Sequence, residues 1–175
     1  FVGAGRLAWF APGARQFQLL NANPPVDYGS LGEFVPLTPE RILDTRTGLG
    51  TGASGARVGP GQTIDITVAG VGGVPVAGAD SVVINVTAVD PTEAGFLTVF
   101  PSGVERPTIS SLNFRTGVTV ANLVTMPIGV NNQVSVYNPY GTVDVLFDVA
   151  GFYSSEGGPS GSRFHWTLPQ RILDT

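Results

Sequence analysis

The chain has no cysteine, no lysine and a single histidine, His165. Without cysteine it cannot contain a disulfide framework, a zinc–thiolate centre or a thiol nucleophile. All 9 basic residues are arginines, and 13 acidic residues outnumber them, which gives a net charge of −4. Because nucleic acids and anionic membranes bind clustered basic residues, we expect neither as a partner. The longest apolar runs are far below the ~18 residues that cross a bilayer, so no membrane insertion is expected.

Catalytic patterns are equally scarce. A Ser-His-Asp triad needs a histidine held by a carboxylate beside the nucleophile, whereas His165 lies in a linker next to Trp166. The glycines of residues 50–55 match a dinucleotide-binding pattern by letter, but no helical pattern follows them. Asp90 and Glu93 offer only two carboxylates to a cation. We therefore predict no enzyme activity, no cofactor and no metal site.

Helical periodicity is missing as well, because apolar residues nowhere recur at positions i, i+3, i+4 and i+7 over three turns. Polar and β-branched residues alternate instead, and 24 glycines and 14 prolines provide chain reversals. The sequence predicts an all-β fold, a single antiparallel β-sandwich of jelly-roll or immunoglobulin-like type with about eight to ten strands. The last two strands are expected to pair across a turn at 138–141. After an opening strand near residue 40, the predicted strands are 63–68, 81–89, 95–100, 108–114, 118–128, 133–137 and 142–152.

A seven-residue motif occurs twice. Residues 39–45 read PERILDT and residues 169–175 read PQRILDT, a separation of 130 positions. A phenylalanine stands at the same distance before each copy, Phe34 and Phe164. The stretch between the module and the second copy is rich in glycine and serine, as flexible linkers are. We interpret residues 34–154 as a sandwich repeat module, 1–33 as a short irregular N-terminal appendage or the end of a preceding module, and 155–175 as a linker and the first strand of a following repeat.

Several ordered blocks over residues 36–153 carry a family resemblance. They are the first motif with Arg46 after it, then 85–88 (NVTA), 94–101 (AGFLTVFP), 112–114 (LNF), 120–124 (VANLV) and 147–153 (FDVAGFY). In these blocks the chain resembles the secreted actinobacterial repeat modules that open with Pro-x-Arg-x-Leu-Asp-Thr-Arg. The resemblance implies an extracellular, largely uncharacterised β-module, found in tandem or attached to secreted enzymes and surface proteins. Many members carry a cysteine pair near the positions of Ser102 and Ser135, so other contacts are expected to hold these strands here.

The charged residues of the motif are expected to act structurally. Asp44 and Arg46 are two residues apart and would share one face of an extended strand, while Arg41 would face the other way. We expect the three to be mostly buried and paired, fixing the register of the strand, so that Asp44→Ala would cost about 3 to 5 kcal/mol. Four further polar residues lie in predicted apolar strands and would tie strands together or share a ligand site. These are Asn85, Asn113, Asn122 and Asp148.

Assembly is the function that these features favour. We expect a non-catalytic structural or adhesive building block of an extracellular or cell-surface assembly, forming a homo-oligomer or polymer. The segment 164–175 is expected to pack against another copy of the chain, because its apolar residues and backbone groups need a sheet edge. The alternative is a module that binds carbohydrate or cell-wall polysaccharide through exposed aromatic rings. The residues considered for these contacts are Trp9, Tyr28, Tyr137, Tyr140, His165, Trp166, Ile172 and Leu173.

Overall fold

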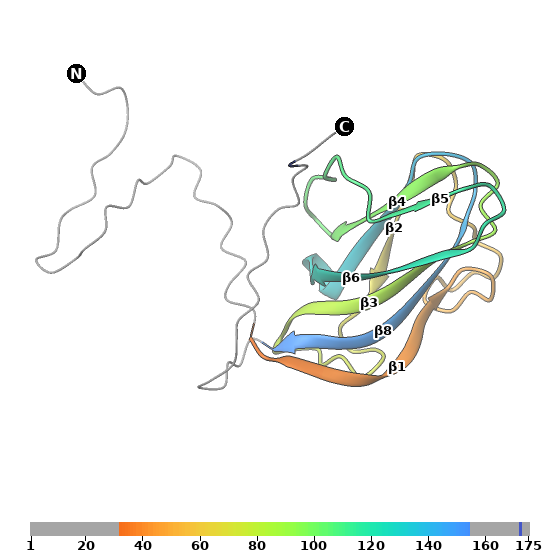
Figure 1. The fold of residues 1–175 in the computed structure, drawn as a ribbon. Helices are drawn as coiled ribbons and strands as arrows, with labels where there is room; N and C mark the ends of the chain where they lie inside the picture. The colour runs from red at the N-terminus through yellow and green to blue at the C-terminus, as the bar shows by residue number, and fades with distance from the viewer. Residues whose placement is uncertain (1–31, 155–171, 173–175) are drawn as a thin grey trace, which may run out of the picture.

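The computed structural model describes residues 32–154, which form a β-sandwich, and Ile172 (Figure 1). Eight strands lie in two antiparallel sheets, which confirms the predicted all-β class. Besides the single 3-10 turn Val130–Asn132, these residues form no helix, and so none that could span a lipid bilayer. The strands are β1 (Phe34–Asp44), β2 (Gln62–Thr67), β3 (Ala79–Val89), β4 (Gly95–Pro101), β5 (Leu112–Phe114), β6 (Val120–Pro127), β7 (Gln133–Asn138) and β8 (Asp144–Ser154).

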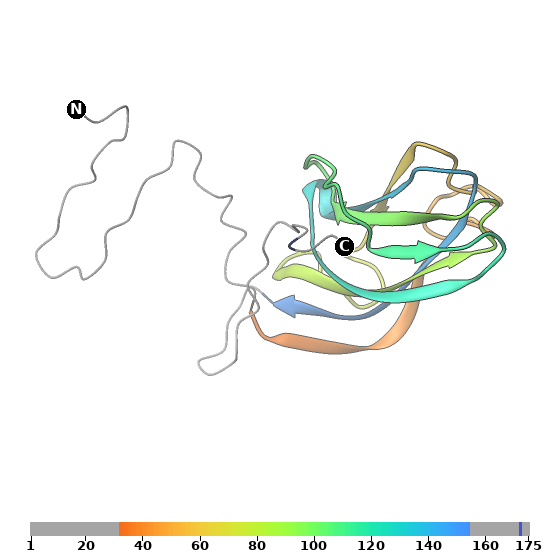
Figure 2. The same cartoon turned by 45° about the horizontal axis from the view of Figure 1, so that its top comes forward.

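The strand order is that of a jelly roll. The first sheet has the order β1-β8-β3-β6 and the second has the order β2-β7-β4-β5. The first strand therefore pairs with the eighth, the second with the seventh, the third with the sixth and the fourth with the fifth. One long antiparallel hairpin has been rolled into two layers, which are seen one above the other in Figure 2. An immunoglobulin-like sandwich keeps its first two strands in one sheet, whereas β1 and β2 lie in different sheets here.

Residues that alternate along the strands fill the space between the sheets. On β8, Val145, Phe147 and Val149 point inward and have no exposed surface, and Phe147 is the largest fully buried side chain. The period-two pattern that predicted the strands is thus the pattern of burial. The remaining apolar strand residues with at most 1% exposed surface are Leu43, Ile66, Val82, Ile84, Val86, Ala88, Leu97, Val99, Val134 and Val136.

The predicted pairing of the last two strands is wrong. β7 pairs with β2 and β4, while β8 pairs with β1 and β3, so the five residues between them, 139–143, cross from one sheet to the other. The physical reason is the shared core: Val136 of β7 and Val145 of β8 are both fully buried, and they lie in different sheets. Local turn chemistry indicated a hairpin, but the burial of both strands required a crossing.

β5 is shorter than the predicted strand 108–114. The residues before it lie against the outer face of the second sheet instead of extending it. The hydroxyl of Thr98 donates to the carbonyl of Ile109 at 2.6 Å, and the guanidinium of Arg106 lies 4.0 Å from the ring centroid of Tyr137. Ser111 also stays beside β4, because its backbone N–H donates to the carbonyl of Leu97 at 2.8 Å, but the ladder pairing with β4 is limited to Leu112–Phe114.

Loops at one end of the sandwich are joined by buried polar contacts. The amide group of Asn138, which has no exposed surface, points its Nδ2 at the carbonyl oxygens of Val58, Gly59 and Gly141 at 3.0 to 3.2 Å. Asn138 thereby holds the β1–β2 loop against the crossing between β7 and β8. Sequence reasoning placed Asn138 in a turn and missed this role, since nothing in its local pattern distinguishes a buried asparagine from an exposed one.

We predict that Asn138→Ala lowers the free energy of unfolding by about 2 to 3 kcal/mol, because it removes a fully buried amide donor that joins three loop carbonyl groups. Chemical denaturation of the purified chain measures this change. The matched control is Asn113→Ala, which removes the same side chain from an exposed position on β5 and is expected to change stability by less than about 0.5 kcal/mol. Equal unfolding midpoints for the two variants would contradict the assigned role.

Candidate functional site

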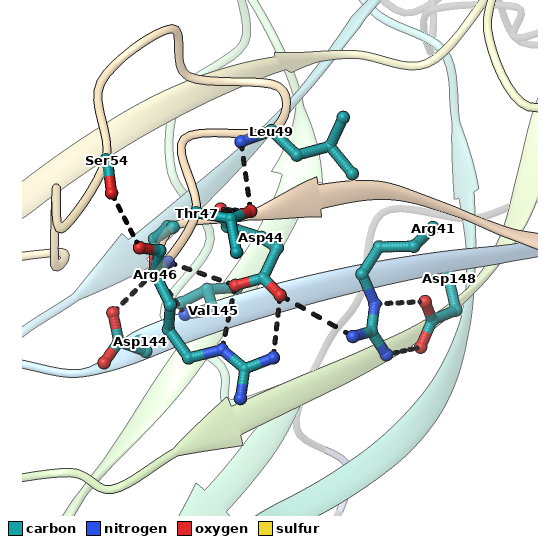
Figure 3. A network of polar contacts seen from close by, with 10 residues as sticks. Arg41, Asp44, Arg46, Thr47, Leu49, Ser54, Asp144, Val145 and Asp148 are labelled. Carbon is teal, nitrogen blue, oxygen red and sulfur yellow. Dashed lines mark hydrogen bonds and ion pairs between the residues drawn. The ribbon is translucent and has the colours of Figure 1, made fainter.

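The charged residues of the motif form one connected network where β1 meets β8 (Figure 3). Asp44, the last residue of β1, is only 4% exposed. Its carboxylate accepts two hydrogen bonds from the guanidinium of Arg46, at 2.9 and 2.7 Å, and a third from the backbone N–H of Arg46 at 3.0 Å. Arg41 approaches the same carboxylate to 3.6 Å. Asp44 therefore lies between two arginines.

Arg41 makes its principal contact across the strand pair. Its guanidinium donates to both carboxylate oxygens of Asp148 on β8, at 2.8 and 3.0 Å. This two-pronged pairing is the geometry that arginine favours with a carboxylate. Asp148, predicted to tie strands together, does so between β8 and β1.

A β-bulge brings Arg41 and Asp44 to the same face. Arg41 is opposite Asp148 and Leu43 is opposite Phe147, so Ile42 is an extra residue without a partner of its own. A bulge changes the alternation of side chains by one position. Leu43 consequently points into the core, while Arg41 and Asp44 both lie on the outer side. The prediction that Arg41 would face away from Asp44 is wrong for this reason.

Of the three motif residues expected to be buried, only Asp44 is buried. Asp44 is buried, but the side chains of Arg41 and Arg46 are 42% and 45% exposed. All three are paired, as predicted, and the prediction that the cluster is mostly buried is wrong. Arg46 follows the end of β1 in a turn, which leaves its side chain at the surface. Partly hydrated ion pairs set strand register more than they add stability.

A second group of contacts extends the network to the end of the sandwich. The buried hydroxyl of Thr45 donates to Asp144 at 2.8 Å and accepts from the backbone N–H of Val145 at 3.0 Å. Arg57 comes within 3.5 Å of Asp144 and donates to the backbone carbonyl of Asp90. Sequence reasoning missed Thr45, Asp144 and Arg57. The repetition of threonine within the motif was the available signal for Thr45.

These pairs shift the pKa values of the motif. The hydrogen bonds from the Arg46 side chain are the main cause that lowers the pKa of Asp44 below 3.8, and the nearby positive charges add to them against the opposing effect of burial. The hydrogen bond with Asp148 raises the pKa of Arg41, and the one with Asp44 raises that of Arg46. All three residues are therefore charged at neutral pH.

The predicted asparagines do not converge on one site. Asn85 is half-buried on β3, next to Asp148 in register, whereas Asn113 is exposed on β5 in the other sheet. Asn122, also exposed, donates its Nδ2 to the carbonyl of Ser111 at 2.7 Å. This bond ties β6 of the first sheet to the segment that leads into β5 of the second. Asn122 thus has the expected structural role, and the four residues form no shared ligand site.

Serine hydroxyls occupy the two positions where relatives are expected to carry cysteine. Ser102 donates to the carbonyl oxygens of Val130 at 2.6 Å and Gln133 at 3.0 Å. Ser135 donates to the carboxylate of Asp65 at 2.5 Å. Both serines are 2% exposed. Hydrogen bonds therefore link β4 to β7 and β7 to β2 at these positions.

The aromatic candidates differ in accessibility. One face of Tyr137 is covered by Arg106, so it offers no free platform on that side. Tyr140 is 54% exposed and meets the ring of Phe96 edge-on, with centroids 6.4 Å apart. Ile172 is 97% exposed. Trp9, Tyr28, His165, Trp166 and Leu173 lie outside the described residues.

A surface hollow of about 500 Å³ lies at the turn between β5 and β6. It is lined by Asn113, Phe114, Arg115, Val118 and Val120. Within residues 32–154, no three His, Cys, Asp or Glu side chains lie close enough to hold a metal ion. No protein-family model and no curated protein matches this chain. The resemblance described from the sequence stays a prediction.

The geometry of Asp44 predicts a pH-dependent contribution to stability. Because its pKa is lower in the folded chain than the ordinary value of 3.8, its contribution is fully present above that value and is lost as the pH falls through the folded pKa. At pH 7 we expect Asp44→Asn to lower the free energy of unfolding by about 1 to 2 kcal/mol, since the arginines it leaves behind remain hydrated.

Denaturation of both proteins at pH values from about 7 to 2 tests this expectation. The difference between wild type and Asp44→Asn is expected to be constant at the upper end and to shrink below about pH 4. A loss of about 3 to 5 kcal/mol, the cost that the sequence predicted for Asp44→Ala, would show that Asp44 behaves as part of a buried pair. A difference that does not change with pH would show that the charge of Asp44 is irrelevant to folding.

Proposed function

We propose that this chain is a non-catalytic structural module, used as a repeated building block of an extracellular or surface assembly, in which each copy of the motif provides the first strand of a sandwich. The observation that carries the proposal is the match between motif and β8. Arg41 binds Asp148, Thr45 binds Asp144, and Leu43 fills the core opposite Phe147.

The second copy keeps every one of these residue types. Arg171, Leu173 and Thr175 stand where Arg41, Leu43 and Thr45 stand in the first copy. The residue types that both copies share include those that contact β8 in the first copy. This supports the view that the second copy is also a β1 strand. Ile172 is 97% exposed, whereas Ile42, at the same position of the first copy, is 6% exposed. The second copy thus has an apolar side chain that pairing as a β1 strand would bury.

Two arrangements would give the second copy a β8 edge. A neighbouring chain could supply one, but each chain has two motifs and, among its described residues, one β8 edge that β1 already fills. Every contact of this kind would therefore release a β1 strand. A further module following the second motif supplies its own β8 and leaves no strand unpaired. We therefore propose tandem repetition as the main arrangement and association of separate chains through 164–175 as the second.

The three acidic residues of the β1–β8 network have structural partners. Asp44 is bound by two arginines, Asp144 by Thr45 and Arg57, and Asp148 by Arg41. For Asp44, the hydrogen bonds from Arg46 lower the pKa and stabilise the charged form, which makes it a poor general acid or base near neutral pH. This supports a non-catalytic role. The extracellular or surface location is part of the proposal and rests on the family resemblance.

We predict that the second motif completes a second sandwich. In a chain extended after Thr175 by another copy of residues 46–154, the second module is expected to fold, giving about twice the calorimetric enthalpy of one module. The matched control carries Leu173→Asp, which places a charge in the buried position of Leu43 and is expected to unfold only the second module. A second module that folds equally well with Leu173→Asp would refute the proposed role of the motif.

Carbohydrate binding is the competing function, and the exposed ring of Tyr140 beside Phe96 is the observation that favours it. We predict no saturable binding to a glycan array or to isolated cell-wall polysaccharide. Tyr140→Ala is the informative variant, because it removes the exposed ring without touching a motif contact. Saturable binding that is lost in Tyr140→Ala would replace the structural proposal with the carbohydrate-binding one.

A further inference from the structure

We infer that the edge of β8 occupied by β1 is an exchangeable binding site for the motif, and that residues 164–175 of the same chain can take the place of β1. This inference deepens the proposed function and rests on its premise that the second copy is also a β1 strand. The edge of β8 binds the motif, and the chain has one copy of the motif at each end of the module.

The ends of the module meet at one point. Phe34 is opposite Tyr153 in register, and the backbone N–H of Ser154 donates to the carbonyl of Glu33 at 3.0 Å. β1 thus begins beside the residue where β8 ends, as Figure 1 shows. A chain that leaves Ser154 and turns back reaches the start of the β1 site and runs antiparallel to β8, as β1 does. Residues 155–163, which are rich in glycine and serine, provide the length for that turn.

The second copy carries the side chains that this edge receives. The ring of Phe34 lies over Gly151, where an added Cβ would come within 2.5 Å of it, and its centroid is 5.4 Å from that of Tyr153. Phe164 is the matching residue. Further along the edge, Asp148 and Asp144 receive Arg41 and Thr45, for which the second copy has Arg171 and Thr175.

The two copies differ in the residues between the phenylalanine and the motif. Val35 and Leu37 are half-buried and pack against the core, and at these positions the second copy has His165 and Thr167. Its large apolar residues, Trp166 and Leu168, stand instead where the first copy has the exposed Pro36 and Thr38. The apolar alternation is out of phase by one residue, which inverts the faces of a strand. This explains why 34–44 occupies the edge and Ile172 is exposed.

Leu43→Asp, Leu173→Asp and the double variant test the exchange. Leu43→Asp places a carboxylate at a position with no exposed surface and drives β1 off the edge. If 164–175 then takes its place, Leu43→Asp is expected to melt about 5 °C or more above the double variant, while Leu173→Asp alone melts like wild type. Equal melting temperatures for Leu43→Asp and the double variant, including complete unfolding of both, would overturn the inference.

Because the chain has no cysteine, an introduced pair reports directly on which strand occupies the edge. Arg171→Cys with Asp148→Cys is expected to form a disulfide in the Leu43→Asp background and to form little in the presence of Leu43. The matched control, Arg41→Cys with Asp148→Cys, is expected to cross-link when Leu43 is present. Cross-linked monomers on a non-reducing gel support exchange within one chain. Cross-linked dimers alone would overturn it in favour of association between chains.

Discussion

The sandwich depends on the pairing of its first strand with its last. β1 and β8 are separated by most of the module, and their antiparallel contact closes the roll that every other strand pair builds up. A contact between such distant segments carries a loop-closure entropy cost, which the core residues of β1 and its polar contacts must offset. The motif places the specific polar contacts of β1 at this pairing, where a shift in register would open the core.

The extra residue in β1 determines what these polar contacts can do. Without the bulge at Ile42, strict alternation would put Arg41 and Asp44 on opposite faces. With it, Ile42 and Leu43 are both buried while the charges share the outer face. If β1 shifted by one residue, it would lose the salt bridge between Arg41 and Asp148 and would also expose Leu43. The network therefore selects one register, and because its arginines are half-exposed we expect its contribution to stability to be modest.

Sequence reasoning located the strands well and their partners poorly. The alternation around Ile84 and Phe147 predicts β3 and β8, because burial on one face of a strand is a local, period-two property. Which strands pair depends on how two faces share one core, so the crossing at Asn138 could not be deduced from a turn signal. The bulge is invisible for the same reason: the letters of the motif do not show which residue lacks a partner. Asn113 failed as a structural candidate because exposure at a sheet edge depends on topology.

A module that recognises its own first strand must also stop further strands from adding. β1 lies at the edge of its sheet and would present free backbone groups to any other chain. Pro36 and Pro39 lack the N–H that an added strand would need, and proline is characteristic of edge strands for this reason. The second copy retains one of them as Pro169. The first copy of the motif thus carries both the residues that bind β8 and a proline that disfavours another strand beyond it, which agrees with a sheet that ends at β1.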